Sequence, residues 1–493
     1  MFTPKRNQLF RHCSGRAWDW QRRLSAVFVF VLLVSAAGQD VGGNAGTNQP
    51  GTQIVPTNTL PAQPLQTPAT PPSDIEALES LTNQFGQLVN PPPQLGPAAV
   101  GAPAAAAPLM GRSVFGGPPG GGGPVVTGAG IPLWGPIDMH PRLSYTFTDG
   151  NGIQSEPGEQ AVTVVNTVTP GVLLNVGQHW SIDYSPSFTF YSNPEFKNAV
   201  DETVFLRGFW AYEDWTLSLS QGYVSSSDPL VETGTQTTQE GYATAISASH
   251  QMNDNLSLDL GVNQNFRLAQ EFTDLYEWTT SDWLDYKANK MFGMGLGVTL
   301  GYDDESVGSD MPFESLQGRI SFNPGPKLSI SLSGGISDRQ FINPSSPPLL
   351  SPVYSGTLTY QLFKPTLLSV TASRSVNPSY FSDQVEVDTS YAASLSQQIS
   401  KKMSFSLSGS YNTTPSSTIQ PGPLPQFFIG PPPNSTLTVV RNDTTTSFQA
   451  GLSYTISSHA SLSVFYSLSD NSSGQAEFAY SSRQIGFSLS YQY

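Results

Sequence analysis

The final stretch of the chain, Ile485-Gly-Phe487-Ser-Leu489-Ser-Tyr491-Gln-Tyr493, alternates large apolar side chains with small or polar ones. A second stretch, Phe292-Gly-Met294-Gly-Leu296-Gly-Val298-Thr-Leu300-Gly-Tyr302, repeats the pattern. Because successive strand side chains point to opposite faces, this period of two predicts a sheet with one apolar and one polar face. About eighteen such segments between Ile137 and Tyr493 predict an all-β, antiparallel, up-and-down transmembrane β-barrel.

The composition agrees with a barrel. Charged residues are 12% of the 493 residues, whereas soluble domains have roughly 25%. Ser, Thr, Asn, Gln and Gly carry the polar character instead, as the inner face of a barrel requires. The formal net charge of −15 argues against nucleic acid as a partner.

Residues 1–38 have the pattern of a secretory signal peptide. Basic residues precede an apolar stretch at 24–34, and small residues suited to cleavage follow it at 35–38. The apolar stretch is shorter than the ~20 residues of a spanning helix, although an uncleaved anchor is the alternative. The single cysteine, Cys13, precedes the apolar stretch, so we expect no disulfide, thiol catalyst or Cys-ligated metal in the mature chain.

Residues 39–136 are rich in Pro and Gly and predict an extended or disordered periplasmic linker. One part of it, near 73–89, predicts a short helix, because Ser73 and Glu76 have the spacing of a capping box. This helix would either bind a partner or plug the barrel, or else form only transiently in a disordered tail.

Tight connections recur at about 35 to 40 residues, except for one wider gap before the last, and two ~10-residue strands with one loop explain this period. They are centred near residues 178, 213, 254, 289, 325, 365, 401 and 458. Eight such turns, with a first and a last strand, predict about 18 strands, or 16 to 20 if one hairpin is merged or split. An even count places both termini on the periplasmic side.

The other connections are long, the largest being 224–238, 338–352 and 412–443. Short periplasmic turns and long extracellular loops are typical of outer-membrane barrels. Tryptophans near the short turns predict an interfacial aromatic girdle, to which Trp278 is an exception; they are Trp134, Trp180, Trp210, Trp215 and Trp283. The aromatic loop segments Tyr380-Phe381 and 425–429 could fold inward or contact ligands.

In these features, residues 137–493 resemble a bacterial outer-membrane β-barrel of the porin kind. The stretches 169–180 and 182–188 further resemble the β-barrel porin-2 type group. The resemblance implies that the barrel-assembly machinery recognises the alternating C-terminal residues, namely Ile485, Phe487, Leu489, Tyr491 and Tyr493. The terminal residue in that family is most often Phe, so Tyr493 should weaken recognition slightly.

Neither a catalytic nor a metal-binding motif stands out in the sequence, so we expect neither an enzyme nor a cofactor. The candidate functional residues are instead charges on the lumen phase of strands, which are Asp183, Arg207, Asp259, Arg267, Arg319, Glu386 and Asp388. They would either line the pore and select solutes by charge or pair with one another and stabilise the wall. Arg207 is the least certain, because both phases of its strand are apolar.

The sequence therefore predicts a channel for passive diffusion of small hydrophilic solutes in the outer membrane of a Gram-negative bacterium. Outer-membrane lipid, the assembly machinery and the solutes are the expected partners, and the barrel could be a monomer or a homotrimer. The alternative function is a non-conducting structural or adhesion barrel that binds partners through its loops. In that case the 412–443 connection or the helix near Ser73 would close the lumen.

Overall fold

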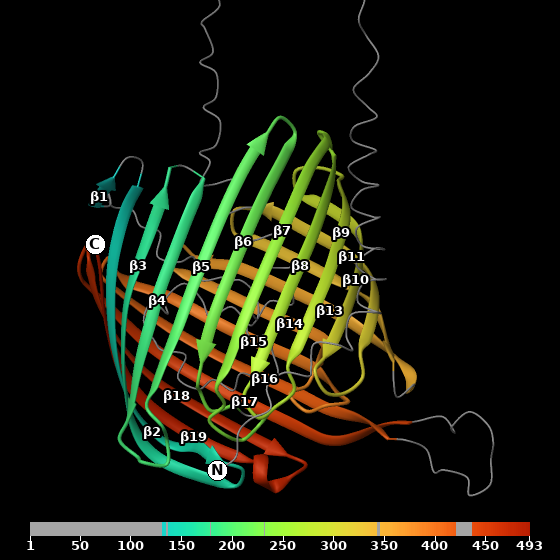
Figure 1. The fold of residues 1–493 in the computed structure, drawn as a ribbon. Helices are drawn as coiled ribbons and strands as arrows, with labels where there is room; N and C mark the ends of the chain where they lie inside the picture. The colour runs from blue at the N-terminus through green and yellow to red at the C-terminus, as the bar shows by residue number, and fades with distance from the viewer. Residues whose placement is uncertain (1–130, 135–136, 178, 231, 343–345, 421–435) are drawn as a thin grey trace, which may run out of the picture. The chain divides into compact units, whose positions relative to one another are not determined.

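The computed structural model describes residues 131–134, 137–177, 179–230, 232–342, 346–420 and 436–493. The predicted signal peptide, the helix near 73–89 and the aromatic stretch 425–429 lie outside these residues. Every strand from β2 to β19 pairs antiparallel with the next one along the chain, and β19 pairs back with β2. The prediction of a closed antiparallel barrel of about 18 strands is confirmed (Figure 1).

The strands are β1 (Ile131–Trp134), β2 (Ile137–Glu156), β3 (Glu159–Val176), β4 (Trp180–Tyr191), β5 (Ala199–Tyr212), β6 (Trp215–Ser226), β7 (Gln239–Asn253), β8 (Leu256–Ala269), β9 (Leu275–Lys287), β10 (Phe292–Glu305), β11 (Met311–Gly325), β12 (Leu328–Phe341), β13 (Ser346–Phe363), β14 (Thr366–Pro378), β15 (Gln384–Ser400), β16 (Met403–Gln420), β17 (Thr436–Ser457), β18 (Ala460–Ser473) and β19 (Tyr480–Gln492). One 3-10 helix, η1 (Ala476–Phe478), lies between β18 and β19. The short strand β1 pairs with the start of β2 and lies within the predicted linker.

The two faces of the wall differ as the alternation predicts. On β10, Met294, Leu296 and Leu300 are exposed on the outside, between 44% and 60%. Glycines alternate with them on the inner face. A closed ring leaves no strand edge, and an apolar outer face suits lipid, so this is the architecture of a transmembrane β-barrel. Among the described residues, none lies in a helix long and apolar enough to span a membrane.

All eight tight turns connect consecutive strands, at the upper end of the barrel in Figure 1. The long connections are shorter than expected, because the strand pairing continues into them. Asp338 pairs with Leu350, and Thr414 pairs with Asp443, inside stretches predicted to be loop. Pro, Asn and Asp signal turns in sequence, but here they lie in strands that extend past the ~10 residues needed to cross a bilayer.

The short-turn end carries paired aromatic rings. Trp180 and Trp210 meet edge to face, and Trp215 stacks on His250 with ring centroids 4.5 Å apart. The expectation that Trp283 belongs to this girdle is wrong, because its side chain is 4% exposed and faces the inside of the barrel. Its neighbour Leu284 occupies the outward phase, and alternation turns Trp283 inward.

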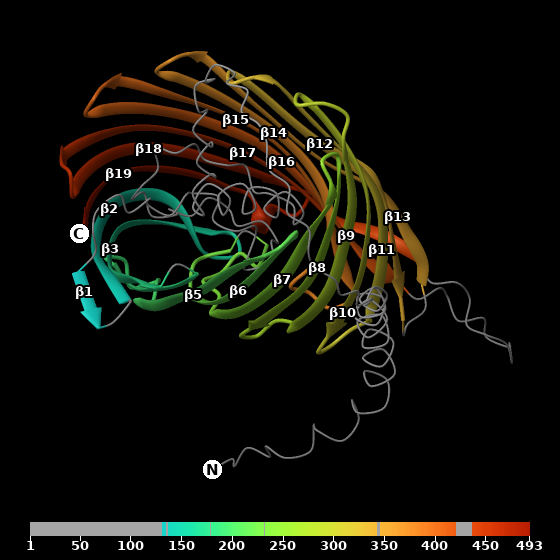
Figure 2. The same ribbon diagram turned by 90° about the horizontal axis from the view of Figure 1, so that it is seen from above.

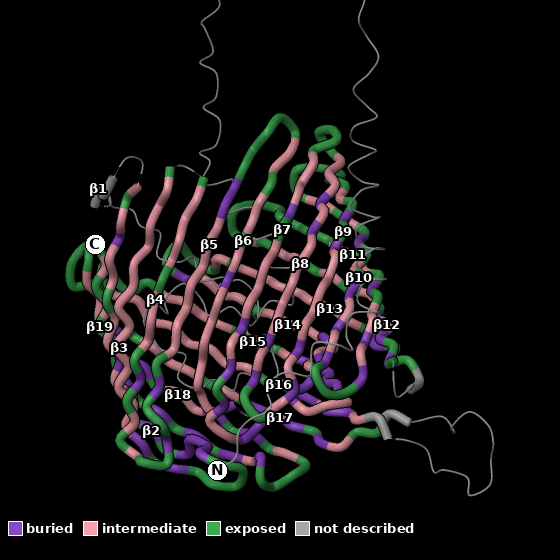
Figure 3. The backbone as a smooth tube through the Cα atoms, viewed as in Figure 1, coloured by how far each residue is buried: buried purple, intermediate pink, exposed green. Residues whose placement is uncertain are grey.

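Buried residues gather at the opposite, long-loop end of the barrel, which we call the mouth (Figure 3). One buried cluster there consists of Leu230, Ala269 and Tyr380, which come from separate parts of the chain. Figure 2, which looks along the barrel, shows the connection that carries η1 inside the ring of strands. The mouth, and not the mid-height of the barrel, therefore holds the packed interior.

Candidate functional site: charges on the inner wall and at the mouth

Arg319 on β11 binds two carboxylates in the short-turn half of the barrel. Its Nη2 lies 2.6 Å from Asp259 Oδ2, and its Nε donates to Asp285 Oδ1 at 2.6 Å. Its guanidinium also lies over the ring of Trp283, 4.5 Å from the centroid. These side chains lie flat across β10 because Gly297 has no Cβ; one built there would be 2.3 Å from Trp283.

A second group of charges lies on β2, β4 and β5. Arg142 pairs with Asp183, and this pair crosses β3 at Gly171. Arg207 shares the inward phase of β5 with Phe205, whose ring centroid is 5.7 Å from its guanidinium carbon. Arg207 belongs to none of the ion pairs formed within the part of the chain that the structure describes.

The β14–β15 connection, residues 379–383, turns into the mouth. The Tyr380 side chain is 2% exposed, and its hydroxyl donates to Gln239 Oε1 on β7 at 2.5 Å. Its carbonyl accepts a hydrogen bond from Thr273 in the β8–β9 connection at 3.1 Å. The expectation that the Tyr380-Phe381 segment folds inward is confirmed for Tyr380.

Arg267 on β8 fixes this inward connection. Its Nη2 donates to the carbonyl of Ser379 at 2.6 Å, and its guanidinium carbon lies 3.9 Å from the centroid of the Tyr380 ring. The Arg267 residue is only 1% exposed. A buried cation thus holds the backbone and the aromatic ring of a connection that starts six strands away, at β14.

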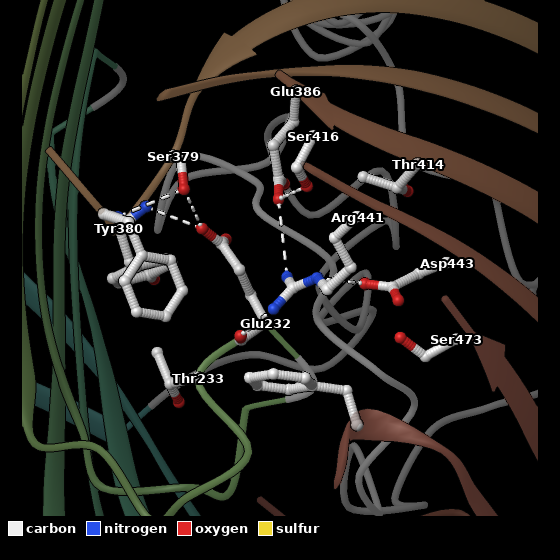
Figure 4. Close-up of polar contacts among 12 residues, drawn as sticks. Glu232, Thr233, Ser379, Tyr380, Glu386, Thr414, Ser416, Arg441, Asp443 and Ser473 are labelled. Atoms are coloured by element: carbon white, nitrogen blue, oxygen red, sulfur yellow. Dashed lines mark hydrogen bonds and ion pairs between the residues drawn. The ribbon is translucent and has the colours of Figure 1, made fainter. Parts of the chain in front are cut away.

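The β6–β7 connection, residues 227–238, reaches the far wall. Arg441 on β17 donates from Nη1 to the carbonyl of Glu232 at 3.0 Å. The Glu232 carboxyl also accepts hydrogen bonds from the 379–383 connection (Figure 4). Strand β17 is seven positions from β6 in one direction around the ring and ten from β7 in the other, so this connection bridges nearly opposite walls.

Arg441 also joins the carboxylates of the mouth. Its Nη2 lies 3.7 Å from Glu386 Oε1, and its Nε lies 2.9 Å from Asp443 Oδ2 (Figure 4). Its guanidinium carbon is 4.3 Å from the ring centroid of Phe478 in η1. Asp388 accepts hydrogen bonds from Asn377 Nδ2 at 2.7 Å and from Thr414 Oγ1 at 2.8 Å.

All seven predicted candidates lie on the inward phase, but they form separate groups. Arg319 and Asp259 meet directly, whereas Arg267 and Glu386 belong to the mouth. The charged residues that sequence reasoning missed are Arg142, Glu232, Asp285, Arg441 and Asp443, together with Asp303 on β10 and Arg339 on β12, which form an ion pair with each other. Arg441 and Asp443 are two residues apart, which places them on one strand face, but they were assigned to a loop. Glu232 carries no sequence signal.

In the connections at the mouth, burial has the largest effect on the pKa values of Glu232 and Tyr380. It raises the pKa of Glu232, although Arg267, Arg441 and the hydrogen bonds from Ser379 and Tyr380 act in the opposite direction. Burial also raises the pKa of the Tyr380 hydroxyl to about 12. Within the described residues, no group of three or more His, Cys, Asp or Glu is arranged to hold a metal ion. The site can bind ions and polar groups by charge and hydrogen bonding.

No protein-family model and no curated protein match the chain. Among solved structures, it is similar to the Pseudomonas aeruginosa protein OpdL, with 12% identity, a TM-score of 0.39, and 72% of this chain and 98% of that chain covered. It is also similar to OccK2 (OpdF) of the same organism, with 10% identity, a TM-score of 0.41 and the same coverage. At this level of similarity, the two structures do not indicate the function of this chain. Membership of the β-barrel porin-2 type group stays a prediction.

Proposed function

We propose that the protein is an outer-membrane channel for the passive diffusion of small hydrophilic solutes. The observation that carries this proposal is the closed 18-strand ring with an apolar outer face and a small, polar inner face. Barrels of 16–18 strands enclose an aqueous lumen, because the ring is too wide for side chains to fill. The inward residues of β12, for example, are serines, one glycine, Arg339 and, at the mouth, Phe341.

The proposal includes an orientation in the outer membrane of a Gram-negative bacterium. The short turns with their Trp and His rings would face the periplasm together with both termini, and the mouth would face the exterior. The C-terminal residues Ile485 to Tyr493 would serve as the signal for the assembly machinery. We leave open whether the functional unit is a monomer or a homotrimer.

Recordings of purified protein in planar bilayers test the proposal. A channel gives discrete conductance steps in potassium chloride, and reversal potentials in unequal salt then measure its ion preference. If well-folded barrels inserted without any steps, the channel proposal would fail.

The bridged mouth favours a second candidate, a non-conducting barrel whose loops bind partners. The 227–238 connection packs there against both the 379–383 connection and Phe478 of the 474–479 connection. They are not the segments expected to close the lumen: part of the 412–443 stretch, and all of the segment near Ser73, lie outside the described residues. A variant with 228–237 replaced by a short Gly-Ser turn separates the two candidates. A channel would conduct more after this replacement, whereas a barrel closed elsewhere would stay silent.

A further inference from the structure

The carboxyl group of Glu232 lies in a polar cradle made by other segments. Its Oε1 accepts hydrogen bonds from Ser379 Oγ at 2.5 Å and from the Tyr380 backbone N–H at 2.6 Å. The positive charges of Arg267 and Arg441 also act on this carboxyl group. Two donors aimed at one oxygen, together with two positive charges that act on it, form a preorganised site for a carboxyl group.

The cradle holds its shape through contacts that do not involve Glu232. Arg267 fixes the Ser379 carbonyl and the Tyr380 ring, and the Tyr380 hydroxyl is bound to Gln239. Arg441 is held between Glu386 and Asp443. The cradle would therefore persist if Glu232 left it.

We infer that this cradle is a binding site for small carboxylate solutes, which Glu232 occupies from within the same chain. A mobile carboxylate that takes the place of the Glu232 side chain releases the 227–238 connection from the 379–383 connection. The hydrogen bond from Arg441 to the Glu232 backbone carbonyl then remains as a hinge at the far wall, and the mouth widens. This inference rests on the proposed channel function and specifies the class of solute that acts on it.

The 227–238 connection is suited to move as a unit. It is hydrogen-bonded within itself, from Leu230 N to the Thr235 carbonyl at 3.0 Å and from Gly234 N to the Leu230 carbonyl at 2.8 Å. Its hydrogen bonds to the 379–383 connection end on the Glu232 carboxyl group, and the one from Arg441 on the far wall ends on the Glu232 backbone carbonyl. Leu230 adds an apolar contact with Tyr380. The second carboxyl oxygen of Glu232, Oε2, is buried without a hydrogen-bond partner. This missing hydrogen bond weakens the hold of the cradle on Glu232.

Binding to the cradle can be measured directly by titrating acetate into detergent-solubilised protein in a calorimeter. We expect Glu232→Ala, which empties the cradle, to bind acetate several-fold more tightly than the wild type. Adding Ser379→Ala to that variant removes one donor and should weaken binding again several-fold. Equal binding of acetate by the wild type and both variants would overturn the site.

Bilayer recordings at neutral pH and constant ionic strength test the gating. Replacing part of the chloride by acetate should raise wild-type conductance saturably, and Glu232→Ala should conduct several-fold more without acetate. Glu232→Gln is the matched control, because its amide oxygen accepts the same two hydrogen bonds; it should stay at the low level in both salts. If Glu232→Ala conducts but acetate does not change the conductance of the wild type, the proposed gating by carboxylates is wrong, while the proposed channel function is supported. If no variant conducts, the proposed channel function is wrong, and the calorimetric titration still tests whether the cradle binds acetate.

Discussion

Most of the charged side chains described above on the inner wall have a partner of opposite charge. Arg319 serves both Asp259 and Asp285, and Arg142 serves Asp183. Of the two interpretations of the lumen charges, pairing across strands describes these contacts, while selection of solutes remains a prediction. Pairing does not exclude selection, because Arg319 keeps 20% of its side chain exposed and an ion in the lumen can sense the charge of the group.

Removing the positive member of such a group should change ion preference. Arg319→Gln leaves Asp259 and Asp285 uncompensated, so we expect the reversal potential in unequal potassium chloride to shift toward cation selectivity. Arg483→Gln is the control, since it removes the same charge from the exposed outer face of β19. Equal shifts in both variants would mean that the Arg319 group does not line the ion path.

A pH dependence follows from Glu232. Its pKa is raised by burial when the 227–238 connection is docked, so the docked form binds the proton more tightly than the released form. Docking of the 227–238 connection is then fully favoured at pH values below 4.5, the ordinary pKa of a glutamate carboxyl group. It weakens as the pH rises through the raised pKa of docked Glu232. The other ionisable groups facing it are Arg267 on β8, Tyr380 and, from the far wall, Arg441 and Glu386.

Wild-type conductance should therefore be lowest in acid and increase toward neutral pH. Glu232→Gln cannot titrate at this position, so we expect its conductance to stay low and nearly constant over the same range. Bilayer recordings of the conductance between roughly pH 4 and 8 test this, because the range starts near the ordinary pKa of a carboxyl group and extends well above it. A wild-type profile that Glu232→Gln reproduces would assign the titration to another group.

At the scale of elements, strands were easier to predict than connections. A period of two is clear in strands such as β10 and β19, because each wall residue must face either lipid or lumen, and it fails in β5, where both faces are apolar. The eight short turns were placed between such strands. The long connections could not be placed, because their contacts depend on residues far apart in sequence. Glu232 and Ser379 are 147 residues apart, and only closure of the barrel brings them together.

The glycine-rich inner face of β10 is a feature that sequence shows but does not explain. A Cβ at Gly297 would be 2.3 Å from the Trp283 ring, whereas one at Gly318, on the outer face of β11, would be 3.8 Å from the nearest atom. We expect Gly297→Val to displace Trp283 and to destabilise the barrel by about 1–3 kcal/mol, as overpacking does. Gly318→Val should cost little.

Thermal unfolding followed by Trp fluorescence or near-UV circular dichroism measures this difference. The two variants add the same side chain to neighbouring strands, so β-propensity cancels between them. Equal unfolding temperatures would show that Trp283 has room to move away from β10.

At the scale of the whole molecule, closure depends on a seam between the first and last long strands. β19 pairs with β2 from Arg483 to Gln492, and Phe487 stacks on Phe147 with ring centroids 5.5 Å apart. The terminal residue, Tyr493, donates its N–H to the Pro141 carbonyl at 3.0 Å, and its ring stacks on His459. The residues predicted to guide assembly are thus also those that close the ring.

Because the strands that close the ring and the connections that bridge the mouth all lie between residues 137 and 493, both properties should survive without residues 39–136. A chain with 39–136 deleted should still resist unheated detergent and show the acetate response of the wild type. The Glu232→Ala substitution in that shortened chain should raise conductance by the same factor as in the full chain, since distant, independent changes add. If deletion alone raised conductance several-fold, residues 39–136 would obstruct the lumen, as the alternative function with a plugging helix near Ser73 requires.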